Sequence, residues 1–89
     1  MDITLSRDTR LSDDGKLIRF IAVWRGRSVQ CAISIEALEE HFWAPDRADS
    51  ERLSRTYWDG RIRIAAAVER RLLRNGSEPI VILTKHFSR

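Results

Sequence analysis

The feature that most constrains this chain is a pair of strand-like segments joined by two turn residues. Residues 17–24 and 27–33 are rich in β-branched and aromatic side chains, and Arg25-Gly26 between them is a tight-turn sequence. A two-residue loop sets the register, which places three apolar pairs directly opposite one another: Ala22 with Val29, Phe20 with Cys31, and Ile18 with Ile33. Register and hydrophobicity agree, so the sequence predicts an antiparallel β-hairpin with one face in the core.

The segment after the hairpin is predicted to form a short helix. Ser34 is a suitable N-cap because its hydroxyl can accept a hydrogen bond from the first turn. Ile35, Leu38 and Phe42 recur at helical spacing and would form the apolar stripe. Pro45 follows shortly afterwards and disfavours a longer helix.

A long helix is predicted from Ser50 to Arg74, where Asn75-Gly76 is a typical C-cap sequence. Asp49 or Ser50 can cap its start. At 100° per residue the main apolar stripe consists of Leu53, Tyr57, Gly60, Ile64, Val68 and Leu72. Gly60 is the weak point of this helix, where a kink or a close contact is expected.

Residues 80–84 are continuously apolar, as expected of a strand in the centre of a sheet, and Ile3 with Leu5 suits a short edge strand. The predicted fold is α+β, one domain over residues 1–89 in the order β-β-α-α-β. Its antiparallel sheet would have three to four strands, with the short helix and the long helix packed on one face. The expected buried core includes Phe20, Val29, Ile33, Leu38, Ile64, Val68, Ile82 and Leu83.

Three stretches of the chain carry a family resemblance. They are Val29-Gln30-Cys31-Ala32-Ile33-Ser34 leading into Glu36-Ala37-Leu38, Tyr57 seven residues before Ile64 in Arg63-Ile64-Ala65-Ala66-Ala67, and Val81-Ile82-Leu83-Thr84 followed by Phe87. With these stretches the chain resembles a small proteobacterial family catalogued as domain of unknown function 1488. In that family the closing strand is often followed by Asp-Phe, and here the place is taken by His86-Phe87, so no role of that acid carries over. The resemblance implies a compact α+β domain and no particular activity.

No catalytic, cofactor-binding or metal-binding motif is found in the sequence. Cys31, the single cysteine, falls on the core side of the hairpin, where it is expected to act as a small apolar residue. His41 and His86 lack the paired spacing that zinc ligands show. The chain is therefore not expected to be an enzyme. A single cysteine, no secretory leader and no long apolar run together favour the cytoplasm.

Arginine makes up most of the 16 basic residues, and the net charge is +3. Along one continuous helix four arginines fall within about 40° of one another and are candidate contacts to nucleic-acid phosphates: Arg52, Arg63, Arg70 and Arg74. A solvated helix face is the alternative explanation, and no helix-turn-helix or RNA-binding signature accompanies them.

A second set of residues on the predicted long helix is apolar but lies off the main stripe. Trp58, Ile62 and Leu73 form this set and are candidate protein-interface residues. The short helix could instead cover them. We expect a small interaction or regulatory module that acts through a homodimer or another protein. The alternative function is non-specific association with nucleic acid through the arginine set; no membrane partner is expected.

Overall fold

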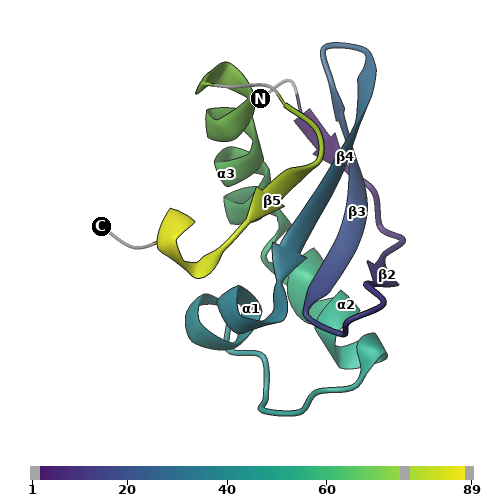
Figure 1. The fold of residues 1–89 in the computed structure, drawn as a ribbon, viewed down its shortest axis with the longest axis vertical. Helices are drawn as coiled ribbons and strands as arrows, with labels where there is room; N and C mark the ends of the chain where they lie inside the picture. Colours follow the sequence, from purple (N-terminus) through teal and green to yellow (C-terminus); the bar gives the residue numbers. More distant parts are fainter. Residues whose placement is uncertain (1–2, 75–76, 88–89) are drawn as a thin grey trace.

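The chain folds into one five-stranded sheet with its helices gathered on one face (Figure 1). The structure is a computed structural model and describes residues 3–74 and 77–87. In chain order the elements are β1 (Ile3–Leu5), β2 (Arg10–Leu11), β3 (Leu17–Trp24), β4 (Arg27–Ser34), α1 (Ile35–His41), α2 (Ser50–Asp59), α3 (Arg61–Arg74), β5 (Ile80–Ile82) and the 3-10 turn η1 (Thr84–His86). The predicted α+β class is confirmed. Within the described ranges no helix is both long and apolar enough to cross a membrane.

The hairpin of β3 and β4 has the predicted register. Ala22 lies opposite Val29, and the pairing runs from Leu17 and Ser34 to Trp24 and Arg27. Arg25 and Gly26 both have positive φ, 52° and 79°, which gives the turn the twist that two antiparallel strands need. The hairpin is therefore specified by local sequence.

The closing strand differs from the prediction in direction, position and length. β5 runs parallel to β4, with Ile80 opposite Cys31 and Ile82 opposite Ile33, and it forms one edge of the sheet rather than its centre. The strand ends at Ile82, so Leu83 leaves the sheet just before η1 and is 37% exposed. The prediction that Leu83 is buried was wrong, because an apolar run does not reveal which of its residues face outward.

The predicted long helix is two helices that meet at Gly60. The ring of Phe42, just after α1, packs onto this glycine so closely that a Cβ there would come 2.6 Å from Phe42 Cε2. Gly60 still donates its N–H to Thr56 and accepts from Ile64, so the backbone passes the break with hydrogen bonds on both sides. The helix is interrupted at Gly60, as expected, and the close contact with Phe42 explains why this residue is glycine.

The core lies between the sheet and the helices. Its fully buried members include Val29, Ile33, Leu38, Ile64, Val68 and Ile82, and Phe20 is 3% exposed; all seven were predicted. Tyr57 is also fully buried and donates its hydroxyl proton to the Ser6 carbonyl at 2.6 Å. Burial raises the pKa of this phenol well above its ordinary value. Tyr57 therefore fastens α2 to the chain just after β1.

Two predicted N-caps are present. The Ser34 hydroxyl accepts a hydrogen bond from the Ala37 N–H at 3.0 Å, and the Asp49 carboxylate accepts one from Arg52 at 2.9 Å. The predicted C-cap at Asn75-Gly76 lies outside the described residues.

Candidate functional site

Two of the three candidate interface residues lie together beside the edge strand β1. Trp58 from α2 and Ile62 from α3 line a groove of about 220 Å³. The other lining residues are Ile3, Thr4, Leu5, Arg61 and Ala65. Ile62 is 71% exposed, so α1 does not cover it. The groove therefore pairs an exposed aliphatic side chain with an edge strand.

The Trp58 side chain is less accessible to a partner than that of Ile62. It is half-buried against the core, and the guanidinium groups of Arg61 and Arg7 lie 4.5 Å and 5.4 Å from its ring centroid. Arg61 also donates a hydrogen bond to the Trp58 carbonyl at 2.9 Å. The two arginines cover much of the indole and leave Ile62 as the more exposed apolar side chain.

Leu73, the third candidate, belongs to another surface. It is 62% exposed and lies three turns after Ile62 on α3, about 16 Å along the axis. It lines a second hollow, between the end of α3 and η1. The three residues therefore do not form one patch.

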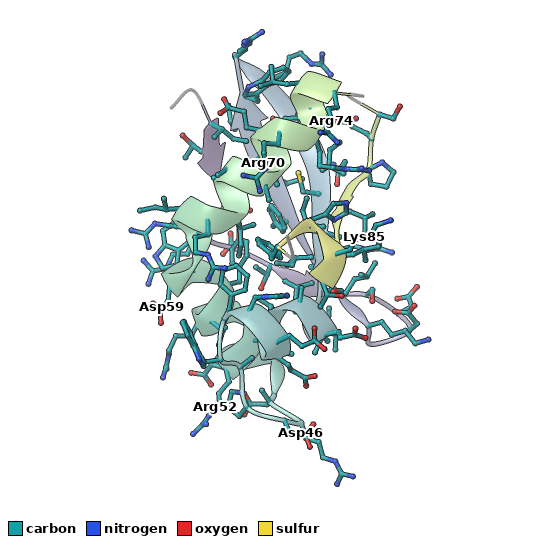
Figure 2. All side chains as sticks on the ribbon, turned by 90° about the vertical axis from the view of Figure 1, so that its left-hand side faces the viewer. Asp46, Arg52, Asp59, Arg70, Arg74 and Lys85 are labelled. Atoms are coloured by element: carbon teal, nitrogen blue, oxygen red, sulfur yellow. The ribbon has the colours of Figure 1, made fainter. Side chains whose placement is uncertain are left out.

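The arginine set is divided in the same way. Figure 2 shows Arg70 and Arg74 in the upper part of the molecule, whereas Arg52 lies in the lower part, on the side of Asp46. The break at Gly60 separates α2 from α3, so the angle expected on one continuous helix does not apply to Arg52. A single stripe of four arginines is not formed; contact of any of them with nucleic acid stays a prediction.

Arg63 is engaged in holding the fold together. Its Nη1 donates to the His41 carbonyl at 2.9 Å, and its guanidinium lies 4.5 Å from the Phe42 ring centroid and 5.7 Å from that of Phe87. These contacts join α3 to the end of α1 and to the C-terminal segment.

Arg70 and Arg74 have different surroundings. With Arg71, Lys85 and His86 they line the second hollow, whose volume is about 500 Å³. The other two lining residues are Ala67 and Leu73. None of the lining residues is acidic, so this hollow gathers positive charge from two elements of the chain.

The comparisons with known proteins agree with this fold. A family model described as protein of unknown function (DUF1488) matches residues 4–83. The chain belongs to this family. A crystal structure of a protein of unknown function from the DUF1488 family of Shewanella loihica PV-4 superposes with a TM-score of 0.71 and is 20% identical, covering 92% of this chain and 90% of that chain. At this identity the likeness shows the fold alone. No curated protein matches the chain.

Cys31 of this DUF1488 chain has the surroundings of a structural residue. It is 3% exposed, its Sγ lies 3.5 Å from the Val29 carbonyl, and burial raises the pKa of the thiol to about 12. In the described parts of the chain no three His, Cys, Asp or Glu side chains gather closely enough to hold a metal ion.

Sequence reasoning missed one conspicuous residue of this DUF1488 chain. Trp43 is 86% exposed and has a φ of 61°, a backbone conformation that bulky residues rarely adopt. The turn that it makes brings Ala44 into the core, where its N–H donates to the Leu38 carbonyl at 3.0 Å. Glycine is the usual residue at such a turn, so the helix-end pattern gave no signal for it.

Proposed function

We propose that this chain is a small protein-interaction module that pairs with a second copy of itself along the edge strand β1. The observation that carries the proposal is that β1 is an end strand of the sheet formed by the described residues, beside the Ile62 groove. Ser6 donates its N–H to the Ile21 carbonyl at 2.7 Å, and the Ile21 N–H donates to the Ser6 hydroxyl at 3.0 Å, so these two residues stand at a hydrogen-bonded position of the ladder. In an antiparallel ladder such pairs alternate, so Thr4 bonds to β3 while the backbone groups of Ile3 and Leu5 point outward.

The open edge is complementary to itself. In an antiparallel two-fold pairing centred on Thr4, Ile3 of each copy would exchange backbone hydrogen bonds with Leu5 of the other. The exposed Ile62 of each copy lies at the groove beside this seam, where the added strand would cover it. An unpaired strand edge next to an apolar side chain is a common template for strand addition.

Pairing along the outer face of α3 is less favourable. In a two-fold antiparallel helix pair the same flank of each helix faces its counterpart, so Arg63, Arg70 and Arg74 would meet the same three residues of the second copy. Pairing through β1 keeps these like charges apart. Arg52 lies on α2 and Arg63 bonds to the His41 carbonyl, so nucleic-acid association through a four-arginine stripe loses the geometry that favoured it.

The test is the oligomeric state, measured by sedimentation equilibrium up to hundreds of micromolar protein. Thr4 is exposed and would lie opposite its own copy, so Thr4→Lys should give a folded monomer because two lysines would then oppose each other. Ile62→Glu should do the same, because it places a charge at the seam.

Leu73→Glu is the matched control for Ile62→Glu. It places the same charge at a similarly exposed position on the same helix but away from β1, so this variant should remain dimeric. A parent protein that is monomeric throughout the range would refute the proposal. Dissociation by Leu73→Glu without dissociation by Thr4→Lys would move the interface to the outer face of α3.

A further inference from the structure

The basic hollow at the end of α3 suggests a second binding site, independent of pairing through β1. We propose that Arg70, Arg71, Arg74, Lys85 and His86 bind the phosphate groups of a phosphorylated ligand. Three of these residues come from the last turns of α3 and two from η1, so two separate elements converge on one hollow of about 500 Å³.

The charge balance of the hollow favours an anion. Its four arginine and lysine side chains form no salt bridge within the described residues, where the one ion pair joins Arg55 to Glu51. The C-terminus of α3 offers a partial negative charge of about half a unit, which is too small to balance four cations. Positive charges held together repel one another, and a bound anion would relieve that repulsion.

The donors suit phosphate oxygens. Arginine presents planar pairs of N–H groups that can bind phosphate in a bidentate manner, and lysine adds a compact charge. Arg70 and Arg74 are exposed, so their guanidinium groups are accessible to a ligand in the hollow. A phosphate monoester or pyrophosphate carries more than one negative charge, which matches several cations better than one carboxylate does.

His86 contributes a donor of fixed direction. Its Nδ1 accepts a hydrogen bond from the Leu83 N–H at 2.8 Å, so the proton of the neutral ring lies on Nε2. Burial, and then the charges of Arg71 and Lys85, lower the pKa of this imidazole below its ordinary value. The ring is therefore neutral at pH 7 and can donate through Nε2 without adding to the repulsion.

The size and apolar wall of the hollow indicate that the phosphate belongs to an organic molecule. Ala67 and Leu73 line it beside the basic residues, and its volume is in the range of small-ligand sites. A free nucleotide and a nucleic-acid strand both present phosphate esters next to apolar surface. The experiment must therefore separate these two sources of the same chemistry.

Binding is measured for three probes: inorganic pyrophosphate and ADP by calorimetry, and a short labelled oligothymidylate by fluorescence anisotropy at several salt concentrations. The double variant Arg70→Gln/Arg74→Gln should weaken binding by about tenfold or more, since it removes charge-assisted hydrogen bonds. Arg52→Gln/Arg55→Gln makes the same change of net charge on α2 and should leave binding within about twofold of the parent.

The three probes identify the source of the phosphate. Binding of pyrophosphate and ADP that depends on Arg70 and Arg74 assigns the hollow to a small phosphorylated ligand. Tighter binding of the oligonucleotide, falling steeply with salt, assigns it to a nucleic-acid strand. Failure of all three probes to bind at low salt, or an equal loss in the α2 control, overturns the site.

A measurement on the unmodified protein covers the case in which the double variant does not fold. Saturating pyrophosphate should raise the pKa of His86, followed by NMR, because a nearby anion stabilises the protonated ring. His41, the other histidine, lies outside the hollow, so its ring resonances at constant pH should not shift when pyrophosphate is added. An unchanged His86 would contradict the site. Thr4→Lys should bind pyrophosphate as the parent does, so the failure of one proposal leaves the other standing.

Discussion

The two ends of α3 use the same kind of residue in different ways. At its start, the Arg63 guanidinium lies over two aromatic rings and bonds to the His41 carbonyl, next to the close contact between Gly60 and Phe42. At its end, Arg70 and Arg74 are exposed at a hollow with no acidic lining. These three arginines share one flank of the helix. What separates them is the neighbouring element: α1 and Phe87 at one end, η1 at the other.

The largest expected effect contrasts a packed residue near the start of α3 with an exposed one near its end. Ile64 is fully buried, so Ile64→Ala should lower the free energy of unfolding by about 2–4 kcal/mol through lost burial and a cavity. Leu73→Ala should change it by less than about 0.5 kcal/mol. Urea unfolding of both variants measures the contrast, and similar losses would mean that Leu73 belongs to the core.

A substitution of Gly60, where α2 meets α3, tests the packing at the start of α3 directly. Gly60→Ala improves helix propensity but places a Cβ against the Phe42 ring, so we expect a loss of about 1–3 kcal/mol. Phe42→Leu combined with Gly60→Ala should cost less than the sum of the two single changes, because the smaller side chain makes room. A stabilising Gly60→Ala, as helix propensity alone would give, would show that the ring moves aside freely.

The hairpin, both predicted N-caps and most of the core could be predicted from the sequence because they depend on local patterns. Apolar pairs at a fixed distance from a two-residue turn determine the register of β3 and β4. Ser34 and Asp49 stand directly before helical segments. Residues at 3.6-residue spacing identify the buried side of α3. Each of these signals needs only a few neighbouring residues.

The direction of β5 and the division of the two surface sets could not be predicted in this way. β5 pairs with β4 across more than forty residues, and its parallel direction follows from how α3 returns the chain to the sheet. The helical wheel assumed one continuous helix, so the break at Gly60 invalidated the angle relating Arg52 to the residues of α3. A wheel also leaves out distance along the axis, which separates Leu73 from Ile62 on α3. The strand β2, two residues long, left no periodic signal.

Two arginines from the same flank provide the next test. Arg63→Ala should lower stability by about 1 kcal/mol, since it removes a hydrogen bond and two ring contacts at an exposed site. Arg70→Ala should change it by less than about 0.5 kcal/mol, in the stabilising direction, because it reduces repulsion in the hollow. Thermal unfolding of both variants at low salt gives the signs. Equal losses would remove the distinction between the two ends of α3.

The smallest expected effect is the pH dependence of stability at the basic end of α3. The pKa of His86 is lowered from its ordinary 6.5 in the folded chain, by burial and then by Arg71 and Lys85, so the unfolded chain binds a proton first as the pH falls. The contribution of His86 to the free energy of unfolding is therefore complete above about pH 6.5, and it is lost as the pH falls toward the pKa of the folded chain.

His86→Gln removes this dependence. As the pH falls from about 8 to about 5, the free energy of unfolding of the variant should therefore rise relative to that of the parent. Unfolding by urea in buffers without phosphate measures it, because a bound anion would mask the repulsion. In the parent background, Lys85→Gln should make the dependence shallower, since a cation that disfavours the imidazolium is gone. If the difference in stability between the variant and the parent is flat across this range, solvent screens the cations around His86 too well for them to act on its ring. That result would also weaken the case for an anion held among these cations.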